Sequence, residues 1–227
     1  MDFGYRWRAL MEAYKKIWKA YERANFIATL GNVDRWREEA VSLFYAVDGR
    51  SPVKVLDAGA GPGNMARHLR GVRYVVALDA TPEMLYVNTT ADEKVVGVFE
   101  YMPFRDKGFD LLLAGYSLHA SIDIERAIAE FNRVSLYQCV VSIGNPNNKF
   151  VRKLLSIYTK FILPKLVCLI TPKEVCKEYK KIHLIISSIP PNAKIREIVG
   201  RYSKFMLFKE RGFGSVYIYF ASSSNFT

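Results

Sequence analysis

From residue 53 onward, short apolar runs alternate with segments whose apolar positions recur every three or four residues. The runs at 53–57, 74–79, 95–99, 109–114 and 138–143 have the length of buried strands. Between them the pattern predicts helices over 63–70, from 81 to 85 and over 124–134. Strands that alternate with helices in this way indicate a parallel sheet covered by helices on both faces.

Helical patterns also precede and follow this alternating region. Apolar residues recur on one helical face over 5–25 and again over 34–46. After residue 148 we expect a helix over 150–169, kinked or broken at Pro164, and a second helix over 171–188. The runs at 205–208 and 215–221 are expected to be closing strands.

The positive charge of the chain is concentrated in its C-terminal third. The formal net charge is +11, and the segment Lys149–Arg211 alone contains 15 Lys and Arg against 4 Asp and Glu. The remaining residues carry equal numbers of acidic and basic side chains. A basic surface of this kind can attract nucleic acid, anionic lipid or an anionic substrate, or it can be no more than a solvated, lysine-rich surface.

The cysteines and the termini place further limits on the protein. Cys139, Cys168 and Cys176 are an odd number without metal-ligand spacing, so we expect no metal site, no disulfide framework and a reducing cytoplasm. The first residues contain no apolar region typical of a signal peptide. The longest apolar stretch, 157–170, is interrupted by Lys160, Pro164 and Lys165, so it is too charged to span a bilayer.

The stretch VLDAGAGPGNMARHL, residues 55–69, is the main candidate for a ligand site. An apolar strand ends at Asp57, and Gly59, Gly61 and Gly63 follow directly. Glycines at the carboxyl end of a first strand let a ligand approach the main chain. A second carboxylate, Asp79, ends the next strand and can accept hydrogen bonds from both hydroxyls of a ribose.

Several ligands could explain such a turn. A phosphate-binding P-loop requires Lys-Ser or Lys-Thr after the glycines, where this chain has Asn64-Met65. In a dinucleotide fingerprint the third glycine comes one residue later, and Asp57 would stand near a pyrophosphate. A carboxylate suits a cationic group such as the ammonium of S-adenosylmethionine (SAM). The alternative without a ligand is a tight turn with Asp57 as a helix cap.

A second passage supports SAM. Glu100-Tyr101-Met102-Pro103-Phe104, followed by Phe109-Asp110, resembles the acid-x-Leu-Pro-Phe and Phe-Asp passage of class I SAM-dependent methyltransferases. The resemblance implies that Phe99 lies against the adenine ring. The family often has an Asp where this chain has Val98, so adenine binding would depend on stacking and backbone contacts. The residues that we expect to bind SAM, with S-adenosylhomocysteine as product, are Asp57, Gly59, Gly61, Gly63, Asp79, Ala80, Met84, Phe99, Glu100, Ala114, Gly115 and Tyr21.

The flanking segments resemble one methyltransferase family in particular. The N-terminal motif of the ubiquinone/menaquinone biosynthesis C-methyltransferases contains Tyr-Asp-x-x-Asn, then Leu-Gly, then Trp-Arg. This chain has similar residues at 21–25, 30–31 and 35–37. Tyr158 with 162–166 resembles the Tyr-x-x-x-Val-Leu-Pro insertion of that family, and Tyr179, 188–192 and 212–219 continue the similarity. The resemblance implies a lipophilic quinol as methyl acceptor.

The chain departs from this family just after the fourth strand. Where the family has Phe-Gly-x-Arg-Asn, this sequence has Tyr116-Ser117-Leu118-His119-Ala120. A neutral imidazole is a suitable base for a phenolic proton, so we expect His119 to act as base or to orient the substrate, with Tyr116 lining the acceptor site. His119 could also merely shape the pocket, and we expect His68 and His183 to be structural.

These observations predict a Rossmann-like class I methyltransferase fold, with a mostly parallel seven-stranded sheet and helices on both faces. We expect one domain over 1–227, made of a helical cap (1–50), a cofactor-binding core (51–148), a basic helical insertion (149–192) and a C-terminal helix with closing strands (193–227).

The substrate that best fits this architecture is a lipophilic small molecule. We expect a cytoplasmic enzyme that binds this substrate at the inner face of a membrane. The apolar and basic residues of the insertion suit contact with anionic lipid, and equally a lid packed on the sheet. Two other functions remain open. One is an RNA methyltransferase that uses the basic segment to bind phosphates. The other is a methyltransferase-like binding protein without catalysis.

Overall fold

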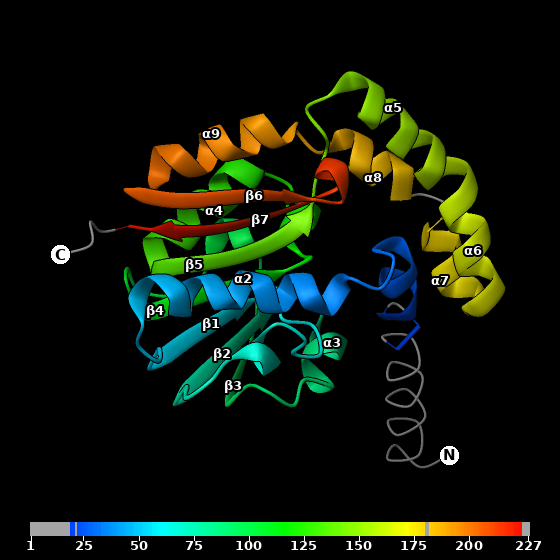
Figure 1. The fold of residues 1–227 in the computed structure, drawn as a ribbon. Coiled ribbons are helices and arrows are strands. Elements are labelled where there is room, and N and C mark those ends of the chain that lie inside the picture. The colour runs from blue at the N-terminus through cyan, green and yellow to red at the C-terminus, as the bar shows by residue number, and fades with distance from the viewer. Residues whose placement is uncertain (1–18, 21, 180–181, 224–227) are drawn as a thin grey trace, which may run out of the picture.

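The computed structural model describes residues 19–223 apart from 21, 180 and 181. These residues form a seven-stranded sheet with helices around it (Figure 1). Its strands lie in the order β3-β2-β1-β4-β5-β7-β6. Their bounds are β1 Lys54–Ala58, β2 Tyr74–Asp79, β3 Glu93–Val96, β4 Phe109–Gly115, β5 Ser135–Ile143, β6 Phe205–Arg211 and β7 Val216–Ser222.

The first five strands are parallel, and β7 runs antiparallel to both of its neighbours. β1 pairs with β2 on one side and with β4 on the other, with Leu56 opposite both Val76 and Leu112. The strand order therefore reverses at β1, and ligands bind in the crevice outside the carboxyl ends of the strands at such a point. The predicted Rossmann-like class I fold is confirmed.

Helices cover both faces of the sheet. α2 (Val33–Asp48) lies in front of the sheet in Figure 1 and packs on β1, β4, β5 and β7 through Trp36, Val41 and Phe44. α4 (Ile124–Val134) and α9 (Asn192–Tyr202) pack on the opposite face through residues such as Phe131 and Ile198. Successive strand residues alternate between these two cores, as burial on both faces requires.

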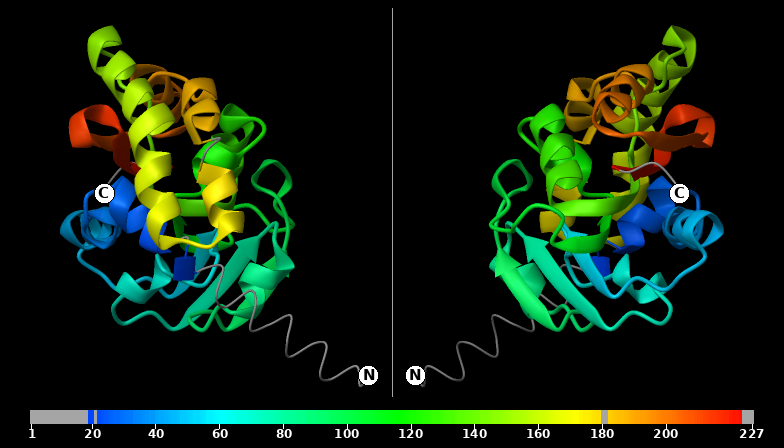
Figure 2. Two further views of the ribbon diagram at one scale, coloured as in Figure 1. Left: turned by 90° about the vertical axis from the view of Figure 1, so that its right-hand side faces the viewer. Right: turned by 90° about the vertical axis from the view of Figure 1, so that its left-hand side faces the viewer.

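A group of helices between β5 and α9 stands beyond one end of the sheet (Figures 1 and 2). It comprises α5 (Lys149–Ile157), a π-helical turn (Tyr158–Ile162), α6 (Leu163–Ile170), α7 (Lys173–Tyr179) and α8 (Ile182–Ser188). α6 and α7 pack against the N-terminal helical residues through a separate core that contains Ala20, Ala24, Leu163, Val167, Val175 and Tyr179. Segments distant in sequence thus form one cover over this end of the sheet.

Two expectations about local structure are corrected. The helix predicted over 63–70 is a turn followed by one 3₁₀ turn, Ala66–His68, because Gly63 has φ +93°, which no helix accommodates. The strand predicted over 95–99 is β3 at Glu93–Val96, and Phe99 instead begins the 3₁₀ turn Phe99–Tyr101. The short helix predicted after Thr81 is α3, Pro82–Tyr86.

The N-terminal helix predicted over 5–25 lies mostly outside the described residues, and residues 19, 20 and 22–28 are helical. The segment 171–188, predicted as one helix, contains α7 and α8. No helix among the described residues is long and apolar enough to cross a membrane.

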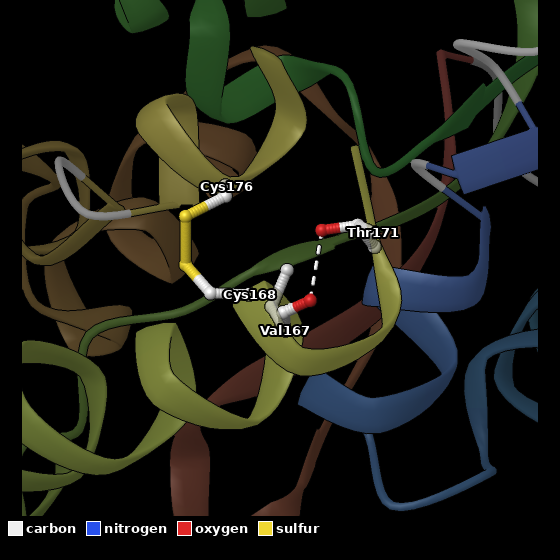
Figure 3. Close-up of a disulfide and its surroundings, with 4 residues drawn as sticks. All are labelled: Val167, Cys168, Thr171 and Cys176. Carbon is white, nitrogen blue, oxygen red and sulfur yellow. Dashed lines mark hydrogen bonds between the residues drawn. A yellow bond between two sulfur atoms is a disulfide. The ribbon is translucent and has the colours of Figure 1, made fainter. Parts of the chain in front are cut away.

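The expectation of a chain without disulfides is wrong. Cys168 near the end of α6 and Cys176 in α7 are joined by a disulfide, with an S–S distance of 2.06 Å and a Cα–Cα distance of 4.7 Å (Figure 3). The chain reverses between the two helices at Thr171, whose hydroxyl donates to the carbonyl of Val167 at 2.8 Å. This reversal brings the two thiols together, while Cys139 is a free, buried cysteine in β5.

Candidate functional site

Two cavities meet at the carboxyl edge of the sheet. The first, here called the loop cavity, has a volume of about 600 Å³ and is lined by residues of the segments that follow β1, β2, β3 and β4. The second, the lid cavity, has a volume of about 500 Å³ and is lined by residues of 25–36, the strand ends and the helices α5 to α8. Asn25 and Tyr116 line both cavities, so the two spaces adjoin at these side chains.

The three glycines after β1 have different surroundings. A Cβ atom added to Gly61 would meet nothing within 4 Å, so its main chain faces open space. A Cβ atom on Gly59 would lie 2.3 Å from the Cβ of Ser117, and one on Gly63 would lie 2.2 Å from the Oγ1 of Thr90. Gly59 and Gly63 are therefore required by close packing, whereas Gly61 leaves the backbone open to a ligand.

Asp79 holds its carboxylate at the wall of the loop cavity. Oδ2 accepts a hydrogen bond from the backbone N–H of Gly61 and Oδ1 accepts one from that of Thr81, each at 2.9 Å. These bonds fix the orientation of the carboxylate, and each oxygen keeps a further lone pair for a ligand hydroxyl. The carboxylate is thus pre-positioned to accept hydrogen bonds from a diol.

Asp57, near the end of β1, is fully buried and is not among the residues that line the loop cavity, although Gly59 and Ala60 just after it are. Neither of its carboxylate oxygens accepts a well-aligned hydrogen bond within the described residues. Burial raises the pKa of Asp57 to about 7, the backbone N–H of Ala66 opposes this rise, and the negative charge of Asp79 adds to it. A buried carboxyl group with so few partners can be stabilised by a cationic group nearby.

Glu100 lines the loop cavity, but its carboxylate already has structural partners. Oε1 accepts hydrogen bonds from the backbone N–H groups of Ile122 at 2.8 Å and Asp123 at 3.1 Å. Glu100 thereby holds the segment that enters α4. The neighbouring Phe99 packs edge to face on Phe131, with 5.5 Å between ring centroids, and its ring contributes an apolar wall to the cavity.

A buried ion pair closes another side of the loop cavity. The guanidinium of Arg37 donates to both carboxylate oxygens of Glu22, at 2.9 and 3.0 Å, and to Asp34 at 2.9 Å. Arg37 is only 3% exposed and lies over the ring of Tyr116. Sequence reasoning assigned no role to Glu22, Asn25 or Arg37, although all three lie within the quoted flanking motifs and that position was the available signal.

Three polar atoms of residues that line the lid cavity have no partner among the described residues. The hydroxyls of Tyr116 and Tyr158 and the Nδ1 atom of His119 are buried, and no described residue forms a hydrogen bond with them. Burial lowers the pKa of His119 to about 4, so its imidazole is neutral at physiological pH. Burial raises the pKa of Tyr116 and of Tyr158, which keeps both phenols protonated.

The rest of the lid cavity is mainly apolar. Its walls include Trp36, Ile143, Leu155, Leu163, Ile186 and Val216. One polar contact in the wall is internal, since the hydroxyl of Tyr179 donates to Oδ1 of Asn25 at 2.7 Å. An apolar cavity with a few hydrogen-bonding atoms suits a mostly hydrophobic ligand that carries one or two polar groups.

The structure brings most of the predicted site residues together. The loop cavity is lined by Gly59, Gly61, Asp79, Ala80, Met84, Phe99, Glu100, Gly115 and Tyr116, and His119 lines the lid cavity. Asp57, Gly63 and Ala114 are not among the lining residues, and Tyr21 lies outside the described residues. The ligand contacts of all these residues stay predictions.

Comparison with known proteins points to one reaction class. Residues 56–136 match a family model described as a methyltransferase domain. Among curated proteins, the chain is 29% identical to a demethylmenaquinone methyltransferase of Thermotoga maritima over 164 residues, covering 68% of this chain and 70% of the relative. It is 27% identical to a demethylmenaquinone methyltransferase of Chlorobaculum parvum over 183 residues, covering 75% of each chain.

Solved structures of low sequence identity share the fold. A SAM-dependent methyltransferase from Thermotoga maritima is 12% identical and superposes with a TM-score of 0.62, covering 93% of this chain and 98% of that one. A SAM-dependent methyltransferase from Aquifex aeolicus is 11% identical with a TM-score of 0.54, covering 89% and 98%.

Proposed function

Because this chain is a SAM-dependent methyltransferase with the class I fold, we propose that it methylates a ring carbon of a lipophilic quinol. The loop cavity is the place for SAM, and the lid cavity is the place for the acceptor. The proposal takes its acceptor class from the named activity of the curated relatives, which act on demethylmenaquinone, and from the chemistry of the lid cavity.

The residues of the loop cavity fit SAM. The fixed carboxylate of Asp79 matches a ribose diol, and Gly61 opens the main chain to the ligand. The rings and side chains of Phe99, Ala80 and Met84 offer apolar walls for adenine. The buried carboxyl group of Asp57, which accepts no well-aligned hydrogen bond from a described residue, suits the ammonium of the methionine part.

The observation that carries the acceptor is the lid cavity itself, with apolar walls and unpartnered atoms on Tyr116, His119 and Tyr158. A quinol has the same composition, an apolar ring system and side chain with two hydroxyl groups. Each hydroxyl can donate to an imidazole nitrogen and accept from a phenol, so the buried polar atoms of the cavity would be satisfied.

SAM supplies an electrophilic methyl group when bound. A ring carbon becomes a better nucleophile when the hydroxyl beside it loses its proton, and the neutral Nδ1 of His119 can receive that proton. Burial opposes the charged imidazolium, so His119 works by forming an ion pair with the phenolate that it creates. After methyl transfer the methylated ring carbon loses its proton to solvent and the ring regains aromaticity, while His119 returns the phenolic proton, so one proton is released per turnover.

Positioning provides much of the expected acceleration. Good alignment of two reactants contributes up to about 7–11 kcal/mol. Tyr116 lines both cavities and stands at their junction, where the transferred methyl group must pass. Residues of α5 to α8 and of the segment 25–30 line the lid cavity, and a bound acceptor that fills this space would exclude water from the reacting groups.

A quinol with a long apolar side chain resides in the bilayer. The enzyme therefore acts at the cytoplasmic face of the membrane. The disulfide between Cys168 and Cys176 is compatible with a cytoplasmic location in organisms, such as hyperthermophiles, whose intracellular proteins keep disulfides.

The test is a partition of label between acceptor pools. Purified protein is incubated with methyl-labelled SAM and, separately, with chemically reduced total lipid and with total RNA from the source organism. We expect label in the reduced lipid, with a loss of about 10²–10⁴-fold in the His119→Ala variant. Label in RNA would overturn the acceptor and assign the basic segment to nucleic acid. SAM binding without label in either pool would contradict the quinol proposal.

A further inference from the structure

We propose that the outer face of α5, the π-helical turn and α6 docks on an anionic lipid surface. This docking face consists of Phe150, Leu154, Ile157, Phe161, Leu166 and Leu169 with the lysines that flank them. The proposal deepens the proposed function by giving the route of a lipid-borne acceptor. Its argument, however, rests on this surface alone.

The docking face is a continuous apolar stripe that the fold leaves exposed. Phe150, Leu154, Phe161 and Leu169 are 68%, 51%, 54% and 81% exposed. The positions 150, 154, 157 and 161 recur every three or four residues, which places them on one side of the helix. In the left view of Figure 2, α5 and α6 face the reader with no described element in front of them.

Packing on the protein does not account for this stripe. The opposite side of the same helices carries the buried residues Thr159, Leu163 and Val167, which face the body of the protein. The segment therefore has apolar side chains on two faces, although its packing buries only one. An exposed contiguous apolar surface rimmed by polar groups marks an interaction site.

Charge identifies the occupant. From residue 149 to 170 the sequence contains no Asp or Glu, and it contains Lys149, Arg152, Lys153, Lys160 and Lys165. The four lysines are exposed around the stripe. Each lysine near an anionic bilayer contributes about 1 kcal/mol, while apolar side chains enter the interface. Apolar residues ringed by lysines, with no acid among them, are complementary to an anionic bilayer.

A recess beside the stripe offers a place for headgroup phosphates. Lys149, Lys153, Ser156 and His183 help to line a cavity of about 350 Å³ between α5 and α8. Arg152 is also at this cavity, but its guanidinium donates to the carbonyl of Pro146 at 2.8 and 3.0 Å and so holds the start of α5 in place. The lysine ammonium groups remain on the rim.

Two other partners fit this face less well. A second copy of the chain in a symmetric contact would bring the same lysines together without acids to pair with them. Single-stranded RNA favours aromatic stacking platforms with arginine, whereas the stripe is mostly aliphatic and its exposed cations are lysines. An anionic bilayer satisfies the aliphatic and the cationic parts together.

The docking face is also well placed for acceptor transfer. Leu155, Tyr158 and Leu163, on the inner side of the same helices, line the lid cavity. A lipid acceptor at the outer face is therefore separated from the lid cavity by this one helical layer. Beyond α6, the disulfide holds α7 to this layer. Both α6 and α7 pack against the N-terminal helical residues.

The test measures binding of the whole chain to vesicles by flotation. One set of vesicles is phosphatidylcholine alone, and the other contains about one third phosphatidylglycerol. We expect at least about tenfold tighter binding to the anionic vesicles, reduced by salt. The Phe161→Ser/Leu169→Ser variant should lose about tenfold of that affinity. The matched control is Val53→Ser/Val96→Ser, which changes two exposed valines elsewhere (54% and 58%) and should bind like the unaltered protein.

Circular dichroism and SAM binding verify that each variant is folded. Equal binding of both variants to anionic vesicles, or binding without preference for anionic lipid, would overturn the docking face. So would loss of self-association or of RNA binding in the Phe161→Ser/Leu169→Ser variant with vesicle binding intact. Vesicle binding needs no turnover, so intact docking without quinol methylation would contradict the acceptor and leave the docking face standing.

Discussion

The guanidinium of Arg37 lies over the ring of Tyr116, 5.4 Å from its centroid, while the same group donates two hydrogen bonds to Glu22. One side chain of α2 therefore joins the N-terminal helical residues to the segment after β4. Because Glu22, Arg37 and Tyr116 all line the loop cavity, this contact fixes one wall of the cavity in which we propose that SAM binds.

We expect the Arg37→Met variant to lose about 3 kcal/mol of unfolding free energy, since it breaks a buried ion pair. SAM affinity should fall as well, because Glu22, which lines the loop cavity, loses both of its hydrogen bonds from Arg37. Isothermal titration with SAM and denaturant unfolding measure the two effects. Arg35→Met, an exposed neighbour on the same helix, is the control. Equal affinities for SAM in the two variants would show that the ion pair does not support the loop cavity.

Asp57 predicts a pH-dependent stability. Its pKa is about 7 in the folded chain against 3.8 in the unfolded chain, so between these values only the folded state holds the proton. The contribution of Asp57 to the unfolding free energy of the free protein should fall by about 4 kcal/mol as pH rises from 4 to 7, and then level off. His119, whose pKa is about 4 in the folded chain, contributes in the opposite direction over this range, so the effect of Asp57 is measured as the difference between the unaltered chain and Asp57→Asn. Asp57→Asn should also weaken SAM binding, while Glu38→Gln, an exposed acid, should follow the unaltered chain in both measurements. Equal pH slopes in the unaltered chain and in Asp57→Asn would refute the assignment.

Substitution by alanine should have different main effects at Gly59 and at Gly61, on the stability of the fold in the first case and on SAM affinity in the second. The Cβ of Gly59→Ala would overlap Ser117 and Phe99, so we expect it to destabilise the fold by about 2–3 kcal/mol. The Cβ of Gly61→Ala would enter open space at φ +51°, with a cost of about 1–2 kcal/mol. Its main effect should be on SAM affinity, measured by titration. Unchanged SAM affinity in folded Gly61→Ala would place SAM away from this turn.

The disulfide should stabilise the cover of the lid cavity. It closes a loop with a sequence separation of 8, and its removal in Cys168→Ser/Cys176→Ser should cost about 2 kcal/mol. Hydrogen exchange should increase in α6 and α7, and the KM for the acceptor should rise while SAM affinity stays constant. A reductant should produce the same changes in the unaltered chain and none in the variant. Faster exchange spread evenly over the sheet would contradict a local role.

The sequence allowed the sheet to be predicted because its strands are continuous apolar runs buried on both faces. The helix 63–70 was wrong because apolar periodicity does not report the positive φ of Gly63. The disulfide was missed because pairing of Cys168 with Cys176 depends on how the chain reverses at Thr171, which no local pattern encodes.

The site was predictable where a motif ends a strand, as at Asp79 and Gly61, because the ends of parallel strands meet at one edge. The lid cavity could not be predicted in this way, because Asn25, Tyr158 and Tyr179 come together only through contacts between distant helices. Glu100 was expected among the SAM-binding residues, which stays a prediction, and its carboxylate accepts hydrogen bonds from backbone N–H groups before α4. Such long-range partners cannot be inferred from spacing.

The most direct test of the central claim is the product formed from a short-chain demethylmenaquinol under reducing conditions. The unaltered chain is supplied with SAM carrying a ¹³C methyl group, and the product is examined by mass spectrometry and NMR. The account predicts one new methyl group on a ring carbon, with turnover strongly reduced in His119→Ala. A methyl group on a quinol oxygen, or bound SAM without any methylated quinol, would contradict it.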